Sequence, residues 1–200
     1  MPHRTYRTFN TATLLLPESV AVAALYETLG DRAAARAEAV ARNLVQARTH
    51  SSCVRLTGEI CSRLDGLGTD ERKLLVHGTH HEQAALLWLA LCRRYTFIRD
   101  FAIEVVRERH LSGRRRVGPD DFEAFYNRKA DWHPELEAKS PNTRRRLRGT
   151  LFQMMRQAGL LLADDALAVV LLGPRLVAAI AAVDRDDLGL FPAFEAGVPG

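Results

Sequence analysis

Apolar residues recur at intervals of three and four along most of the chain, the spacing that produces an amphipathic helix. Glycine, proline and capping residues divide this pattern into short pieces. The pattern predicts helices over about 17–29, 32–45, 51–64, 70–77, 80–92, 96–109, 119–129, 135–139, 141–158 and 174–183. From Ala84 to Cys92 apolar residues cover every face, so this helix is expected to lie in the core. The predicted fold class is therefore mainly α, a helical bundle.

The order of the elements predicts three units along the chain. Residues 1–66 contain three short helices with the third exposed, which indicates a helix-turn-helix-like unit. Residues 67–111 hold the buried central helices. In residues 112–200 a helix, a short helix and a long helix precede two apolar runs that Asp164 and Asp165 separate. This order is typical of a winged helix, so we expect a winged-helix-like unit with one short β-hairpin and an acidic tail.

The long helix of the third unit carries the clearest functional signal. Ser140 and Pro141 are suited to begin it, and five arginines but no acid lie between Ser140 and Ala158. At 100° per residue, the side opposite the apolar stripe carries Arg145, Gly149, Gln153 and Arg156, with Arg146 beside them. Arginine binds phosphate or guanine, and glutamine binds adenine. The alternative is a solvated charged face.

The pattern thus predicts a partner, double-stranded DNA, and a set of residues that contact it. Phosphate would be held by Arg145, Arg146, Arg148 and Arg156, and Gln153 would reach a base edge. Two further candidates are the loop Arg114-Arg115-Arg116 and Arg55, which is expected to point outward from the third helix. The loop is equally well explained as a solubilising segment.

The charge distribution agrees with this interpretation. The chain has 28 basic and 24 acidic residues, a net charge of +4. Residues 111–158 have a net charge of +5, whereas residues 159–200 have −4. A positive region followed by an acidic tail favours an anionic partner for that region, and it carries no information on the fold.

Catalytic patterns are weak in this sequence. Asp120, with Glu137 and Lys139 further on, matches the letters of a PD…ExK nuclease, but that chemistry needs carboxylates on neighbouring strands and these residues lie in predicted helices. His77, His80 and His81 lack the further ligands of a zinc site. We therefore expect no enzymatic activity, no metal and no cofactor.

Cysteine usage and hydropathy bear on the location of the protein. Three cysteines, Cys53, Cys61 and Cys92, form no paired framework, which favours a reducing compartment. The apolar stretch 158–183 is interrupted by charges at Asp164, Asp165 and Arg175, so its uncharged pieces are well short of the ~20 residues of a membrane-spanning helix. The start of the chain carries no signal-peptide pattern. The expected location is cytoplasmic.

Five segments, in matching order over nearly the full length, resemble one protein family. They are Leu14–Ser19, His81–Tyr95, Trp132–Leu136, Met155–Leu161 and Gly173–Leu176. Together they resemble the BrxA family of BREX phage-exclusion systems. The resemblance implies a non-enzymatic, mainly helical protein with DNA-binding-like domains, which works beside the other BREX components. It supplies no functional residues, so the arginine assignments rest on their chemistry alone.

Two other functions remain open. The arginine helix could dock an acidic protein, which would make the chain an adaptor within the defence complex. The chain could also bind RNA. DNA sequence specificity and oligomeric state are not accessible from these patterns.

Overall fold

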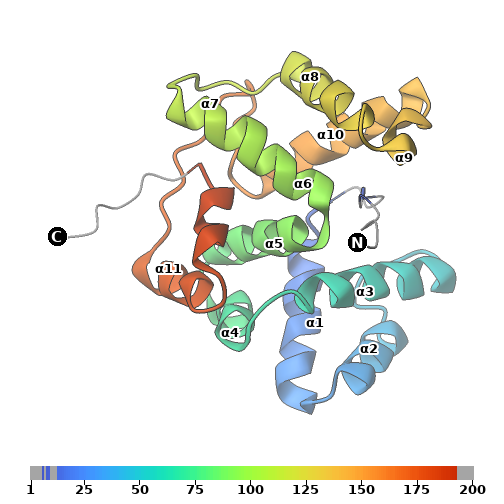
Figure 1. Ribbon diagram of the computed structural model, residues 1–200. Helices are drawn as coiled ribbons and strands as arrows, with labels where there is room; N and C mark the ends of the chain where they lie inside the picture. Colours follow the sequence, from blue (N-terminus) through green and yellow to red (C-terminus); the bar gives the residue numbers. More distant parts are fainter. Residues whose placement is uncertain (1–5, 7, 10–12, 193–200) are drawn as a thin grey trace.

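The computed structural model describes Tyr6, residues 8–9 and residues 13–192 (Figure 1). This part of the chain is mainly helical, which confirms the predicted class. The helices are α1 (Leu16–Leu29), α2 (Arg32–Ala41), α3 (His50–Leu64), α4 (Thr69–His77), α5 (His80–Arg94), α6 (Thr96–Phe101), α7 (Glu108–Leu111), α8 (Pro119–Ala130), α9 (Pro134–Glu137), α10 (Pro141–Gln157) and α11 (Pro174–Ala181). A π-helical segment, η1 (Ala102–Arg107), joins α6 to α7, and a 3-10 helix, η2 (Arg185–Leu190), follows α11.

Side-chain caps determine where several helices begin. The Asp31 carboxylate accepts hydrogen bonds from the first turn of α2, and Ser140 Oγ accepts from the Thr143 amide at 3.2 Å at the start of α10. Thr79 and Glu82 form the reciprocal capping box that their spacing predicts. These contacts satisfy amide groups that have no partner within the helix.

Several helix boundaries differ from the prediction by a few residues, and two of them have a clear physical cause. The helix α4 begins at Thr69, one residue before the predicted start, because the Glu71 carboxylate accepts from the Gly68 amide at 2.6 Å and so Gly68 is the cap position. The helix α2 ends at Ala41 instead of about residue 45. Asn43 has a φ of 49°, a left-handed conformation that asparagine tolerates and a helix cannot contain.

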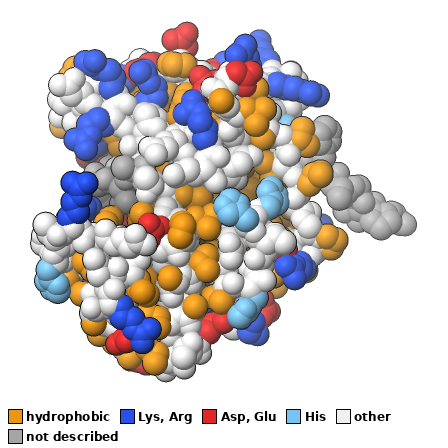
Figure 2. Space-filling view, turned by 180° about the vertical axis from the view of Figure 1, so that it is seen from behind, with side chains coloured by type: hydrophobic (Ala, Val, Ile, Leu, Met, Phe, Trp, Pro, Cys, Tyr) orange, Lys and Arg blue, Asp and Glu red, His pale blue; other side chains and the backbone are white. Residues whose placement is uncertain are grey.

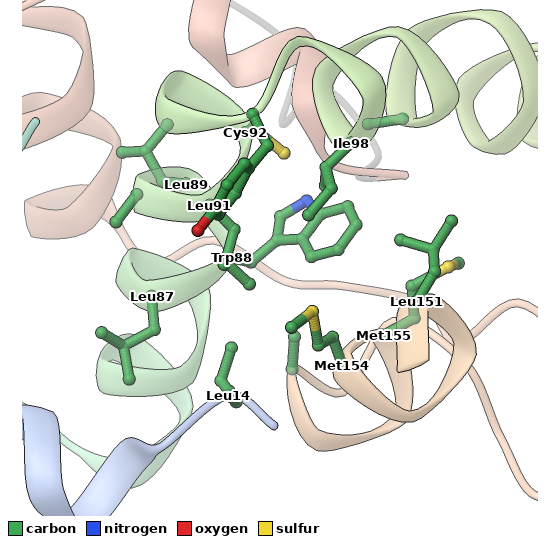
Figure 3. Packing of buried hydrophobic residues seen from close by; sticks show 14 of the residues in the cluster. Leu14, Leu87, Trp88, Leu89, Leu91, Cys92, Ile98, Leu151, Met154 and Met155 are labelled. Carbon is green, nitrogen blue, oxygen red and sulfur yellow. The ribbon is translucent and has the colours of Figure 1, made fainter. Parts of the chain in front are cut away.

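The core is built around α5, which lies in the middle of the molecule between α1–α4 and α6–α10 (Figure 1). Every residue from Ala84 to Cys92 is buried, as its apolar pattern predicts. Figure 3 shows Trp88 beside Ile98 of α6 and close to Met154 and Met155 of α10. The Trp88 indole Nε1 donates to the Leu190 carbonyl at 3.0 Å. One helix therefore serves as the shared core of the N-terminal and C-terminal helices.

Aromatic side chains connect α6 to the helices that follow it. The rings of Phe97 and Phe101 each stand edge-on to Phe125 of α8, with centroids 5.2 Å apart. Phe152 of α10 lies 6.5 Å from Phe101. This cluster places α8 and α10 against α6 and so determines which face of α10 is exposed.

The predicted β-hairpin is not confirmed, because no segment of the described residues is assigned as a strand. Two isolated antiparallel bridges are present instead, between Arg116 and Ala166 and between Leu161 and Leu167. The Leu167 amide also donates to the Arg115 carbonyl at 2.7 Å. The arginine loop thus lies alongside the turn that contains Asp164 and Asp165. The division into three units stays a prediction.

The helices of the described residues are too short or too polar to span a bilayer, including α11 in the apolar stretch 158–183.

Replacement of Trp88 tests the role of α5. Trp88→Ala should lower the free energy of unfolding by about 3–5 kcal/mol through the cavity it leaves. Trp88→Phe should cost about 1–3 kcal/mol, since the buried Leu190 carbonyl loses its donor. The control is Trp132→Phe, because the side chain of Trp132 is 82% exposed, and its effect should stay within about 0.5 kcal/mol. Urea unfolding of the three variants makes the comparison, and equal effects at the two tryptophans would contradict it.

Acid unfolding tests the link between α5 and α11. The Arg175 guanidinium, at 2.6 Å, and the Thr79 amide hold the pKa of Glu82 at about 2, below its ordinary value. A lowered carboxyl pKa stabilises the fold above the unfolded pKa of about 4.3, and this contribution is lost as the pH falls towards 2. Glu82→Gln should therefore be less stable than wild type at pH 7, and the difference should shrink between about pH 4 and 2. Melting temperatures across this range would contradict the assignment if the two curves stayed parallel.

Candidate nucleic-acid interface

The helix α10 has the two faces that its sequence predicts. Leu147, Leu151, Met154 and Met155 are buried against the core, and Gln153 is exposed on the other side. The space beside Gly149 is open, because a Cβ built there would meet no heavy atom within 4 Å. Packing against another part of the described residues therefore does not explain this glycine, and among them a ligand backbone has room to approach.

Arg145 and Arg146 stand free on the exposed side of α10. Both side chains are exposed. Arg145 donates to Asn142 Oδ1 at 2.9 Å within its own helix, and within the described part of the chain neither arginine has a carboxylate partner. These two guanidinium groups are available to an anion without breaking an ion pair.

Arg144 and Arg148 are held by α8. The Glu123 carboxylate lies 2.6 Å from Arg144 Nε and 3.0 Å from Arg148 Nη1. The Arg144 guanidinium also lies 4.3 Å from the centre of the Tyr126 ring. Arg148, predicted to hold phosphate, is thus half-buried in a link between two helices.

Arg156 and Arg116 are paired with the acidic turn. Arg156 Nη2 forms an ion pair with the Asp165 carboxylate. Arg116 Nη2 donates to the Asp164 carbonyl at 2.6 Å and lies 3.7 Å from its carboxylate. Asp165 has a φ of 63°, a left-handed conformation that aspartate tolerates. Two predicted phosphate contacts therefore already hold an internal anion.

The expectation of a surface without carboxylates is therefore wrong in three dimensions. α10 itself has no acid, but carboxylates from α8 and from the following turn lie against three of its five arginines: Arg144, Arg148 and Arg156. Glu123 and Asp165 belong to other elements, so helical periodicity within α10 contains no signal of them. Figure 2 accordingly shows both Lys and Arg and some Asp and Glu side chains over the upper part of the molecule, where α8–α10 lie.

The remaining predicted contacts lie in two places. Arg114 and Arg115 are exposed on the loop beside the acidic turn, and no side-chain partner is found for them in the described ranges. Arg55 is exposed on α3, as predicted, but α5 lies between α3 and α10 (Figure 1). The structure therefore brings Arg114–Arg116 towards α10 and leaves Arg55 on a separate surface.

Some residues in and beside the nuclease-like and histidine-rich motifs make contacts within the described fold. The Asp121 carboxylate, in the first turn of α8, accepts from the Gly118 amide at 2.9 Å. His77 Nε2 lies 2.9 Å from Glu27, and His81 Nε2 lies 3.1 Å from the Leu171 carbonyl. Within the described residues no three side chains of the types that bind metals converge on one point.

A family model matches most of this chain. The model is that of BrxA, and it matches residues 5–184. The chain belongs to the BrxA family. This BrxA family member is also 25% identical over 146 residues to the "BREX protein BrxA" of Escherichia coli O9:H4 (strain HS), a match that covers 73% of this chain and 68% of the relative.

A solved structure has the same fold as this BrxA family member. It is the crystal structure of an uncharacterized protein from Magnetospirillum magneticum, with a TM-score of 0.76 over 90% of this chain and 94% of that one. The two sequences are only 16% identical, so the comparison concerns the fold alone.

Proposed function

We propose that this chain is a non-catalytic, DNA-binding component of a BREX anti-phage defence system. The name of the E. coli relative supports the assignment to BREX. The observation that carries the DNA-binding part is the pair Arg145 and Arg146, exposed on α10 and without a carboxylate partner in the part of the chain that the structure describes. The proposal places the protein in the cytoplasm, with DNA and the other BREX components as partners.

The order of elements around α10 supports this function. The continuous helix from α6 to α7 is followed by a loop in which Arg116 forms a β-bridge, then by α8, α9 and α10, and then by the bridged turn 160–168. A winged helix has the same order, with the third helix in the DNA groove and the hairpin beside it. α10 is then the helix that enters the groove, although the wing is reduced to isolated bridges.

The arginines would contact phosphate in two ways. Arg145 and Arg146 can bind at once, because their present environment is solvent and an amide oxygen. Arg116 and Arg156 would first exchange an aspartate for a phosphate. Because that exchange replaces one anion by another, its net gain is smaller than that of a free arginine. Gln153, exposed one turn before Arg156, is the candidate for a base contact.

An adaptor function is the second candidate. Trp132, in the turn between α8 and α9, is 82% exposed, and tryptophan is enriched among the residues that dominate protein interfaces. An adaptor would bind neither nucleic acid with appreciable affinity. RNA binding is a further alternative. It is distinguished from DNA binding by whether unlabelled RNA or unlabelled duplex DNA competes more strongly for the protein.

Salt titration of duplex binding tests the proposed function. Arg145→Ala/Arg146→Ala should weaken duplex binding about tenfold. The negative slope of log K against log salt concentration should become shallower by about 2, one counterion for each lost phosphate contact. The control is Lys73→Ala/Arg185→Ala, which removes two exposed cations from other elements and should retain the wild-type slope. Binding that is unchanged by the α10 substitutions would show that α10 is not the contact.

The acidic turn supplies an independent test. Asp164→Asn/Asp165→Asn should tighten duplex binding about threefold to tenfold at low salt, since Arg116 and Arg156 lose their internal anions. Asparagine is suited to position 165 because it tolerates the left-handed conformation. Asp70→Asn/Asp186→Asn removes the same charge from exposed positions elsewhere and is the matched control. Equal effects of the two double variants would mean that only net charge matters.

A further inference from the structure

A second group of arginines lies on the N-terminal helices. From Ala39 to Gly58 the chain contains Arg42, Arg48 and Arg55 and no acidic residue. Arg36, one and a half turns before Arg42, lies in the middle of α2. The helices α2 and α3 pack on each other and on α1, so these residues belong to one compact part of the molecule (Figure 1).

Three of these arginines have no internal anion. Arg36, Arg48 and Arg55 are exposed, and no carboxylate of the described residues pairs with them. By contrast, two other exposed arginines in or next to α2 have carboxylate partners. Arg32 pairs with Asp65, and Arg42 Nε lies 2.6 Å from Glu38. The same helices therefore supply both free and neutralised guanidinium groups.

A glycine brings two of the free arginines, Arg36 and Arg55, onto one side of the α2–α3 pair. Arg36 Nη2 lies 3.3 Å from the point where a Cβ of Gly58 would stand, so the guanidinium crosses from α2 to α3 there. Arg55 is three residues before Gly58 and therefore on the same side of α3. Arg48 immediately precedes Thr49, the cap of α3. We call Arg36, Arg48 and Arg55 the α2–α3 surface.

The chemistry of the α2–α3 surface fits phosphate better than a protein. The hydroxyl groups of Thr49 and Ser51, 3.3 Å apart, follow Arg48 in the sequence, and such groups commonly donate to phosphate oxygens. Neither α2 nor α3, both fully described, exposes a large apolar side chain of the kind that anchors a protein partner. The α2–α3 surface is therefore cationic and polar, and these are the properties of a site that binds a nucleic-acid backbone.

The α2–α3 surface is separate from α10. Cys53, Thr57 and Ile60 direct the inner side of α3 towards the core, and α5 lies between α3 and α10 (Figure 1). Bending one short duplex around the molecule to reach both would cost about 1–6 kcal/mol for a turn of 40–90° over 20–30 base pairs. Two duplex segments can bind without that cost.

We propose that the α2–α3 surface binds a second segment of duplex DNA through its phosphates, so that one chain holds two segments at once. This inference rests on the proposed function, in which α10 binds the first segment. The second contact is independent of base sequence, because it is made by arginines and hydroxyls that face a backbone.

A bridging assay tests the inference. A duplex of about 15 base pairs, roughly one and a half helical turns, is immobilised, saturated with the full chain and exposed to a second, fluorescent duplex of the same length. Wild type should retain the fluorescent duplex. Arg48→Ala/Arg55→Ala should bind the immobilised duplex within about threefold of wild type through α10, yet retain at least tenfold less of the second duplex.

Matched variants make the result specific. Arg32→Ala/Arg42→Ala removes two paired arginines from the same part of the molecule and should bridge as wild type does. Arg145→Ala/Arg146→Ala should also lose bridging, because only one surface remains. Circular dichroism confirms that each variant is folded.

Three results would overturn the inference. Wild type that binds the first duplex but captures no second one would refute it while leaving the proposed function intact. An Arg48→Ala/Arg55→Ala variant that still bridges would show that two copies of α10 hold the two duplexes. Wild type that binds no duplex at all would refute the proposed function and this inference with it.

Discussion

Burial of α5 on every side is the constraint from which the rest of the arrangement follows. A helix that is apolar all round has no face to give to solvent, so other helices must cover it completely. In this chain α1, α3 and α4 supply part of that cover, and α6, α10 and η2 supply more. The exposed side of α10 exists because its other side, through Leu151, Met154 and Met155, is part of this cover.

Electrostatic pairing then decides which arginines are free. The fold places a glutamate between α8 and α10 and an aspartate turn beside the end of α10, and these anions occupy three arginines of the helix. Arg144 and Arg148 consequently stabilise the packing of two helices. Arg145 and Arg146, on the same helix, are left to the solvent. Arginines that are neighbours in the sequence thus have different roles. The difference comes from carboxylates of other elements, Glu123 of α8 and Asp165 of the following turn.

Much of the fold could be predicted from local chemistry. The capping box of Thr79 and Glu82 and the Ser140 cap act over three residues, and the buried run in α5 needs no knowledge of its partners. The π-helical segment Ala102–Arg107 and the early end of α2 could not be predicted, because each depends on a conformational choice at a few residues. The apolar runs of the expected hairpin do meet, but in the described residues they form only isolated bridges: Leu161 and Leu167 are buried, whereas Leu162, Val169 and Leu171 are exposed.

The candidate site was predictable in its residue types and its periodicity, and much less so in its partners. The helical spacing of 100° per residue correctly placed Gly149 and Gln153 on the exposed side of α10. It carried no information on Glu123 or Asp165, because contacts between elements depend on the tertiary fold.

The acidic turn has a consequence for how ion release is counted in this protein. When an arginine leaves an aspartate for a phosphate, the DNA gives up a condensed cation, but the aspartate left behind attracts one from the solvent. The cation released from the DNA and the cation taken up by the aspartate partly cancel in the net number of ions released. A thermodynamic count of released ions would therefore be smaller than the number of guanidinium groups that touch the backbone, and the shortfall would measure how many carboxylates had been uncovered.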